Sequence, residues 1–443
     1  MNFHKSIVLL FCFVSMINAK EYFVSSIKEY KELVGKNNIK AGDIITLKNG
    51  IYKNVKFKLK ANGTYEKPVI LKAETPSKVI ITGRSSLQIF GDFLTVKGLV
   101  FKNGEPANNP LIAIGHSHYM SHYCRLTNIV IDDFNRKNLN DKYHWVTIVG
   151  SHNRVDHCKF TNMKNRGVTL KVALLKNQKP NYNMIDHNEF SFRKASKKNG
   201  YETIRIGNSK VSMQSSKTVV ADNYFYHCDG EIEIISNKSC DNLYIHNTFK
   251  NCKGMLTLRH GDNCFVKDNY FINTDNSFMG GIRIIGKNHK IINNYFYNVG
   301  ASSLRAAISL INSKKDVPIH DYLPVENITI THNKFIDTKY TIFSAANYKN
   351  GLYDIPPKNI YIYNNVFFNT KQLFTYHGEN PHFEFKDNIL YKTFDKNIMK
   401  TGYYIDPEFK SKNGIFVSHI NTIFHESENY PITKKEVGPK WIK

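Results

Sequence analysis

No segment of the sequence is apolar over the roughly 20 residues that a membrane-spanning helix needs, so we expect no membrane span. Cys-x-x-Cys pairs, which often hold structural zinc, are also missing. The formal net charge is +24, yet the chain has no basic arm and no known nucleic-acid recognition motif. These absences argue against a membrane protein, a zinc-stabilised domain and a nucleic-acid-binding protein.

The first 19 residues have the composition of a cleavable export signal. Lys5 precedes the short apolar run Ile7–Val14, and the small residue Ala19 stands at a plausible cleavage point. We therefore expect residues 1–19 to be a signal peptide and residues 20–443 to be a secreted or periplasmic protein.

Charge alone leaves the partner of the protein open. A net charge of +24 suits a polyanionic partner. Lysine greatly outnumbers arginine, however, and a generally lysine-rich composition would give the same charge. The sequence does not indicate an oligomeric state.

An internal repeat of about two dozen residues dominates the chain. Its marker is Asn-x-Phe or Asn-x-Leu, and the central steps between markers are 24, 22 and 25 residues. Short β-rich runs such as Leu243–Ile245 precede most markers, and a second set, such as Glu202–Ile206, lies between them. The markers begin at Asn188, Asn223, Asn247, Asn269, Asn294, Asn333, Asn365 and Asn388.

Several short strands in each repeat predict an all-β fold, a right-handed parallel β-helix in which the coils stack about 4.8 Å apart. The repeated asparagines should form a ladder of side-chain amides at a bend, with the repeated phenylalanines stacked inside. Leucine-rich repeats do not fit, because their consensus and helical halves are missing, and propellers need longer units. No composition break divides the chain, so we expect a single β-helix domain.

Both ends of the solenoid are expected to differ from its body. Ser26–Val34 has the apolar spacing of a helix that could cap the first coil, where an exposed sheet edge would invite pairing. From about Gly402 the repeat gives way to an irregular C-terminal tail. Near the middle, Cys228 and Cys252 each lie five residues after a marker, so they could form a disulfide between neighbouring coils or remain buried thiols.

Strand alternation predicts a column of charges on one face. If Ile204/Ile206, Ile232/Ile234, Leu256/Leu258 and Ile282/Ile284 point inward, the outward residues are Arg205, Glu233, Arg259 and Arg283. Glu231 would lie beside Glu233, about 6.6 Å away along the strand, close enough for both to share a cation. Lys238 follows just past a predicted turn and could reach the same face. A solvated salt-bridge ladder would show the same pattern.

The residues of this region resemble polysaccharide lyase family 6, which comprises alginate lyases and chondroitinase B. The spacing Glu-x-Glu-x4-Lys followed by Arg-His is the specific part of the resemblance, which runs from about residue 21 to 400. The segments that carry it are Asn199–Gly207, Asp229–Asn242, Leu258–Gly261 and Gly280–Gly286, with Ala41–Tyr52, Gly98–Gly104 and Leu304–Ile308.

The resemblance implies β-elimination assisted by a calcium ion. Asn199, Glu231 and Glu233 would bind the calcium, Lys238 would be the general base, and Arg259 would lie nearest the departing oxygen. A hard cation on the uronate carboxylate would neutralise the charge that develops when the base removes the C5 proton.

Three further residues fall where the family lines its substrate groove, namely His260, Arg283 and Arg305. Alginate is the favoured substrate and dermatan sulfate the alternative, because the extra sulfate and N-acetyl groups would need arginines and space. This chain has few arginines, and its Asn312–Asp316 loop offers lysines.

Two other functions remain as alternatives. A polygalacturonase-like hydrolase would need acids that are not in place: Asn273–Asp275 is present, but the Asp132–Asp133 pair lies upstream, and Gly-His-Gly and Arg-Ile-Lys are absent. A glycan-binding β-helix without catalysis would suit the fold and the charge, but it has no need of Lys238 at this spacing.

Overall fold

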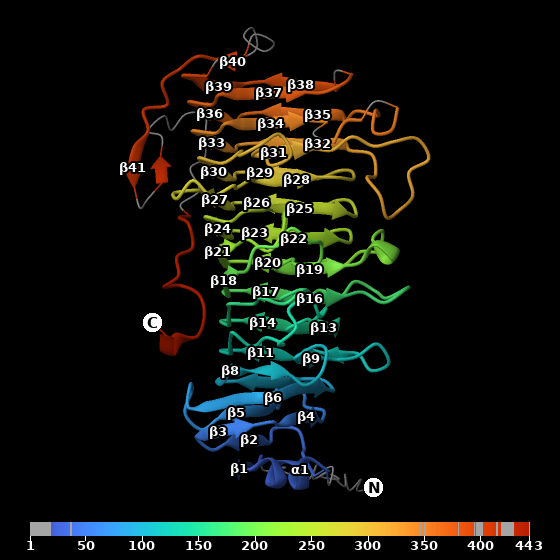
Figure 1. Cartoon of the computed structure of the whole chain (residues 1–443), viewed down its shortest axis with the longest axis vertical. Coiled ribbons are helices and arrows are strands. Elements are labelled where there is room, and N and C mark those ends of the chain that lie inside the picture. Colours follow the sequence, from blue (N-terminus) through green and yellow to red (C-terminus); the bar gives the residue numbers. More distant parts are fainter. Residues whose placement is uncertain are drawn as a thin grey trace, which may run out of the picture.

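The chain forms a right-handed parallel β-helix, as the repeat predicts (Figure 1). The predicted signal peptide, except Ala19, lies outside the residues that the structure describes. None of the helices in the described part of the chain is long and apolar enough to cross a membrane. The computed structural model describes residues 19–35, 38–345, 347–349, 351–379, 381–393, 395, 402–412, 415–417 and 429–442.

Each coil contributes strands to three faces, called A, B and C. Face A contains β1 (Glu21–Val24), β2 (Ile44–Leu47), β5 (Val69–Ala73), β7 (Leu94–Lys97), β11 (Arg125–Thr127), β14 (Arg154–Asp156), β17 (Met184–Asp186), β20 (Val219–Ala221), β23 (Leu243–Ile245), β26 (Phe265–Lys267), β29 (Lys290–Ile292), β32 (Glu326–Thr331), β35 (Lys358–Tyr363) and β38 (Phe383–Lys386).

Face B contains β3 (Gly50–Lys53), β6 (Val79–Phe90), β8 (Leu99–Pro106), β12 (Val130–Asp132), β15 (Lys159–Thr161), β18 (Glu189–Arg193), β21 (Tyr224–Cys228), β24 (Thr248–Lys250), β27 (Tyr270–Ile272), β30 (Tyr295–Tyr297), β33 (Lys334–Ile336), β36 (Val366–Phe368), β39 (Asn388–Tyr391) and β40 (Gly402–Tyr403). The long strand β6 continues from face B into face C, where it pairs with β4 and β9.

Face C carries the candidate site described below. It contains β4 (Lys56–Lys60), the end of β6, β9 (Ile112–Ile114), β13 (Val146–Ser151), β16 (Leu170–Ala173), β19 (Ile204–Gly207), β22 (Glu233–Lys238), β25 (Met255–His260), β28 (Ile282–Ile284), β31 (Ile308–Leu310), β34 (Tyr340–Ser344) and β37 (Gln372–Tyr376), with β10 (Ser121–His122) beside β13.

The predicted asparagine ladder is confirmed at the bend between faces A and B. The Asn223 Nδ2 donates to the Asn247 Oδ1 at 3.0 Å, and the Asn247 Nδ2 donates to the Asn269 Oδ1 at 3.0 Å. The residue before each ladder asparagine has positive φ, 54° at Asp222 and 53° at His246, which explains the Asp, Asn and His found there. Inside the bend the marker phenylalanines stack, with ring centroids 4.6 Å apart for Phe225 and Phe249.

The ends also follow the prediction. Helix α1 (Ile27–Gly35) caps the first coil, where Tyr30 is buried edge-on against Phe57 with ring centroids 4.9 Å apart. At the other end the tail turns back along the outside of face B (Figure 1). It contains the antiparallel pair β41 (Lys410–Lys412) and β42 (Ile415–Val417) and the short helix η2 (Lys440–Ile442).

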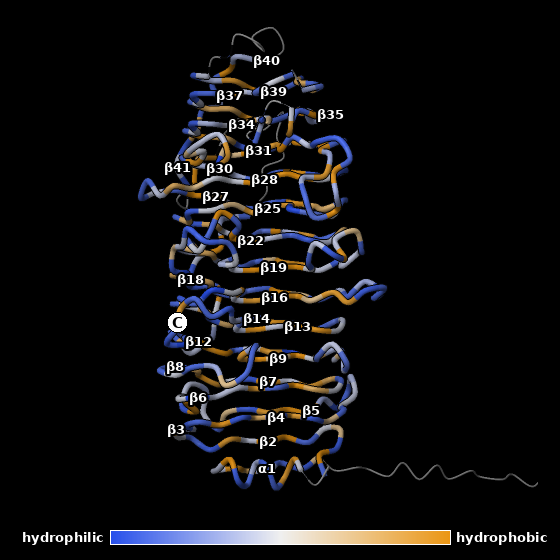
Figure 2. The backbone as a smooth tube through the Cα atoms, turned by 45° about the vertical axis from the view of Figure 1, so that its right-hand side comes forward, coloured by the Kyte–Doolittle hydropathy of each residue, from blue (hydrophilic) through white to orange (hydrophobic). Residues whose placement is uncertain are grey.

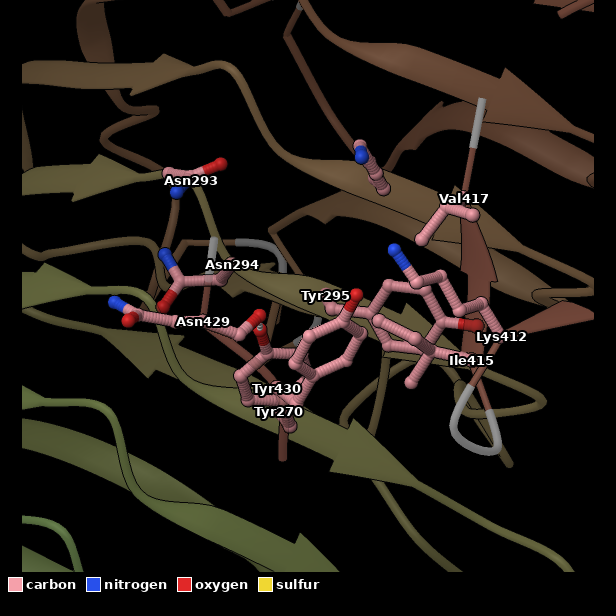
Figure 3. Close-up of a pocket in the computed structure, with 10 residues that line it drawn as sticks. Tyr270, Asn293, Asn294, Tyr295, Lys412, Ile415, Val417, Asn429 and Tyr430 are labelled. Atoms are coloured by element: carbon pink, nitrogen blue, oxygen red, sulfur yellow. Dashed lines mark hydrogen bonds between the residues drawn. The ribbon is translucent and has the colours of Figure 1, made fainter. Parts of the chain in front are cut away.

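The tail encloses a pocket of about 240 Å³ against face B, where Tyr270 and Tyr295 face Tyr430 (Figure 3). The Tyr295 hydroxyl accepts a hydrogen bond from the Phe416 backbone N–H at 3.1 Å, and the Tyr430 carbonyl lies 2.8 Å from the His246 Nε2. Among the described residues, neither a carboxylate nor an arginine lines this pocket, whose lining has the character of a docking contact for the tail.

The predicted charge column is wrong in part, because β22 contains irregularities. The register shifts between Glu233 and Ile235, so that Ile235 and Asn237 align with the inward residues Ile204 and Ile206, while Ile234 is buried in the core as predicted and Ile232 is half-buried. A shift of one residue moves a side chain to the other face of a strand. The outward column is therefore Arg205, Ser236, Thr257 and Arg283. Glu233 lies opposite Met255, and Arg259 is the residue without a partner on β22 between the aligned residues Leu258 and His260.

All six cysteines among the described residues are buried thiols, which excludes the disulfide alternative. Cys228 and Cys252 do lie on neighbouring coils, as expected, and the Cys228 N–H donates to the Cys252 Sγ at 3.4 Å.

Candidate active site

A cavity of about 780 Å³ on face C brings all eight predicted site residues together. Strands β22, β25 and β28 form its floor, and the segments that precede β19, β22 and β31 form its walls. The eight predicted residues among those that line it are Asn199, Glu231, Glu233, Lys238, Arg259, His260, Arg283 and Arg305.

Lys238 is the last residue of β22, next to a second register shift that pairs it with His260. Its side chain is partly buried, and it forms no ion pair with any carboxylate of the described residues. Burial lowers the pKa of Lys238, and Arg205 and Arg259 add to this effect, while Glu233 and Glu202 oppose it. The lysine is therefore easier to deprotonate than an exposed one.

Arg259 lies over the same cavity, held by a loop that precedes β32. Its Nη1 donates to the Asp321 carbonyl at 3.1 Å, and its guanidinium lies 4.5 Å from the centre of the Tyr322 ring. The Lys314 Nζ fixes this loop by contacting the Asp321 carboxylate at 2.6 Å. Sequence reasoning did not identify Tyr322 or Asp321, because their approach depends on the folded path of the loop.

Two further carboxylates, Glu202 and Glu233, lie close enough to Glu231 to act on it electrostatically. The Glu231 Oε1 accepts hydrogen bonds from the Gly200 and Tyr201 backbone N–H groups at 2.9 and 2.8 Å. Burial raises the pKa of Glu231 to about 7, and the charges of Glu202 and Glu233 contribute. Glu202 was not predicted as a site residue, although it lies within a segment that carries the family resemblance.

Glu233 is paired with Arg283 and with the Ser236 hydroxyl, and its Oε1 lies 3.9 Å from the Arg259 Nε. Arg283 is 5% exposed and thus contributes to the floor of the cavity by holding Glu233 in place. Arg305 lies at the rim, where its guanidinium is 5.0 Å from the centre of the partly exposed Phe278 ring.

His260 is 1% exposed, and burial together with Arg259 and Lys238 lowers its pKa to about 3. It is therefore a neutral imidazole at ordinary pH. Its Nδ1 is buried without a hydrogen-bond partner among the described residues, although the side chain lines the cavity. A substrate hydroxyl or carboxylate could supply that partner.

The predicted calcium ligands carry oxygen donors, which are the atoms that a hard cation binds. The raised pKa of Glu231 shows a carboxylate that lacks a neutralising charge, whereas Glu202 is paired with the Arg205 Nη1 at 3.5 Å and leaves only its Oε2 without a hydrogen-bond partner among the described residues. No three histidine, cysteine or carboxylate side chains of the described residues are grouped tightly enough to form a complete metal site. A cation bound by Glu231 and Glu233 would thus need oxygens from Asn199, water or substrate.

Several proteins of known structure are similar to this chain in both fold and sequence. The family model for chondroitinase B matches residues 24–430. The PL6 family alginate lyase AlyGC superposes with a TM-score of 0.90 at 33% identity, over 95% of this chain and 58% of that chain. A mannuronic-acid-specific family 6 lyase from human gut microbiota gives 0.74 at 29% identity, over 87% and 89%. A family 6 lyase from Pseudopedobacter saltans gives 0.74 at 26% identity, over 95% and 99%.

Fold and site place the protein among the parallel β-helix proteins related to polysaccharide lyases. The chain belongs to the chondroitinase B family, polysaccharide lyase family 6. It spans 58% of the length of AlyGC and most of the length of the other two structures. No sequence among curated proteins matches it.

Proposed function

We propose that the protein cleaves an acidic polysaccharide by β-elimination and leaves a 4,5-unsaturated uronate at the new chain end. The observation that carries the proposal is the cavity on face C, where an unpaired, partly buried lysine lies with an arginine and a pair of carboxylates. Family membership supports it, since the related structures are described as polysaccharide or alginate lyases.

In this mechanism Lys238 acts in its neutral form. It takes the C5 proton of the uronate, the C5–H electrons form the C4–C5 double bond, and the C4–O bond breaks. Arg259 donates charge-assisted hydrogen bonds to the departing oxygen, to which water supplies a proton. Burial of both side chains favours these roles, because it lowers the pKa of Lys238 and excludes competing solvent.

Asn199, Glu231 and Glu233 would hold a calcium ion beside the substrate carboxylate. Bound there, the ion would neutralise that carboxylate and make the C5 proton more acidic. Arg283 would keep Glu233 oriented, and the backbone N–H groups of Gly200 and Tyr201 would keep Glu231 oriented.

Alginate is the substrate that we propose. Dermatan sulfate would add sulfates, which bind best to planar arginine groups. The arginines of the cavity are already engaged: Arg283 with Glu233, Arg259 with Tyr322 and Arg305 with Phe278. Two of the related structures are also described as alginate or mannuronic-acid lyases. Export through the predicted signal peptide would bring the enzyme to such a polymer.

The substrate is tested by incubating the purified protein separately with mannuronate-rich, guluronate-rich and alternating alginate and with dermatan sulfate. Formation of the double bond is followed by ultraviolet absorbance. We expect the fastest reaction on one of the alginate fractions. A faster reaction on dermatan sulfate than on every alginate fraction would contradict the choice of substrate and leave β-elimination intact.

A further inference from the structure

Face C contains a second cavity, of about 740 Å³, on the side of the active site that leads toward the N-terminus. Its floor is formed by β9, β13 and β16, which stack below β19 and β22 on the same face (Figure 2). The predicted site residues all lie in the first cavity, so neither the sequence nor the family assignment accounts for this one.

The second cavity arises from small side chains on its floor and from the turns beside it. Outward positions on β9 and β16 are occupied by the small residues Ala113 and Ala173, while turns that follow the strands rise beside them. Leu174 and Leu175 after β16 and the His116–Ser117 turn after β9 form one wall. The result is a groove one strand wide that runs across three coils.

Lys171 provides a charge on this floor. Its side chain is partly buried, and no ion pair or hydrogen bond joins it to any described residue. Burial lowers its pKa to about 8, and the nearby cations Arg205 and Lys142 contribute. Glu202 is a nearby carboxylate that acts in the opposite direction, but it is paired with Arg205 and forms no ion pair with Lys171, so an anionic ligand would supply the direct partner that this half-buried cation lacks.

A neutral hydrogen-bonding group lies next to this lysine. Thr147 pairs with Lys171 in the register of β13 and β16, and its Oγ1 is buried without a hydrogen-bond partner among the described residues. A carboxylate could accept hydrogen bonds from both side chains, because it has two oxygens. Buried polar atoms normally have partners, so these two groups indicate a site for an anion with several oxygens.

The two cavities adjoin each other. Asn208 lines the second cavity and Ser209, the next residue and the first of the short helix η1 (Ser209–Val211), lines the first. Between them Arg205 follows Lys171 in the outward column and precedes Ser236. With coils about 4.8 Å apart, Lys171 lies about 10 Å from the coil of Lys238, the span of two sugar residues in an extended chain.

We propose that the second cavity is an accessory subsite, in which Lys171 and Thr147 bind a uronate carboxylate further along the polysaccharide that is being cleaved. The inference rests on the proposed function and extends it. It makes the enzyme sensitive to substrate length: chains that reach Lys171 bind more tightly than chains that end within the catalytic cavity.

The test compares binding of short and long oligouronides by titration calorimetry, with Lys238→Ala as the background so that no turnover occurs. In this background Lys171→Gln should weaken binding of the long oligomer about tenfold, and should lower binding of the short one by a much smaller factor. Ala173→Phe, which fills the floor without removing a charge, should show the same dependence on length. Lys290→Gln removes an exposed lysine from face A and is the matched control.

Losses of affinity that are equal for long and short oligomers would overturn the subsite. An unchanged affinity for the long oligomer in Lys171→Gln or in Ala173→Phe would also overturn it. The result is independent of the proposed chemistry, because binding is measured without cleavage. Failure of the lyase proposal would show separately, as the absence of an unsaturated product from the wild-type protein.

Discussion

At the residue scale, Lys238 and Arg259 differ from the other basic residues of the chain because the strands that carry them are irregular. The register of β22 and β25 shifts between Asn237 and Lys238, so that Lys238 faces His260 and Arg259 has no aligned partner. Bulges of this kind redirect side chains beside active sites. Both basic groups are thereby directed into one cavity with the carboxylates.

Replacement of the proposed base should abolish turnover without unfolding the protein. We expect Lys238→Ala and Arg259→Ala each to lower kcat by about 1,000-fold, because each removes a group that acts on the reacting atoms. Lys290→Ala, on an exposed part of face A, should keep normal activity. Ultraviolet product assays with circular dichroism as a check of folding would measure this. Near-normal turnover by a folded Lys238→Ala protein would exclude the lysine as the base.

Activity should rise as the pH is raised through neutrality. Glu231 has a pKa raised to about 7, so below that pH it is increasingly protonated and loses its charge for a cation. Lys238 has a lowered pKa, so a larger neutral fraction is available above neutrality than for an ordinary lysine. Both changes act in the same direction. A kcat/KM profile that falls steadily between mildly acidic and mildly alkaline pH would contradict these assignments.

Removal of metal should also remove activity. We expect a chelator to inactivate the protein, added calcium to restore it, and Glu231→Gln to need at least about tenfold more calcium for the same rate, because one charged ligand is lost. Elemental analysis and activity measured on the same samples would check this. Full activity in samples that contain no metal would assign Asn199, Glu231 and Glu233 to direct substrate binding.

The family spacing predicted which side chains lie together, but the sequence could not predict contacts that depend on bulges and loops. The eight predicted residues do line one cavity. Strand alternation alone placed Glu233 level with Arg205, whereas Ser236 occupies that position, because alternation cannot anticipate an inserted residue. Tyr322 approaches Arg259 from a loop more than two coils away in sequence, which no local pattern indicates.

At the scale of elements, the buried asparagine ladder holds the coils in register. The Asn269 Nδ2 donates to the carbonyls of Tyr244 and Lys267, both at 2.9 Å, and its Oδ1 accepts from the Asn247 Nδ2 at 3.0 Å. The ladder was predictable because identical residues recur at the coil period. The sequence could not distinguish the two faces beside the ladder, because both contain short strands of similar composition.

Breaking the ladder should destabilise the fold. Asn269→Ala should lower the free energy of unfolding by about 2–4 kcal/mol, since it leaves buried partners without hydrogen bonds. Asn288→Gly is the control: Asn288 belongs to an exposed ladder and has φ of 58°, which glycine adopts without strain, so the loss should stay below about 0.5 kcal/mol. Urea unfolding of both variants gives the comparison. Equal losses would show that burial of the ladder contributes nothing.

At the scale of the whole molecule, a solenoid places its functions along one face. Periodicity predicted the solenoid and its N-terminal cap. It could not predict that the tail returns along face B, because contacts such as that of the Lys440 N–H with the Asn128 Oδ1 at 3.4 Å join segments without a shared repeat. No residue of the described part of the tail lines either cavity on face C, and the catalytic cavity and the cavity beside it lie next to each other along that face.

The chemistry of cleavage tests the central proposal most directly. The masses of the products made from alginate by the purified protein distinguish elimination, which adds nothing to the chain, from hydrolysis, which adds one water for each bond cut. We predict products whose masses sum to that of the substrate, with one end carrying the double bond that absorbs in the ultraviolet. Products that have gained water and show no such absorbance, or an alginate that binds and is recovered uncut, would contradict the assignment of this site to β-elimination.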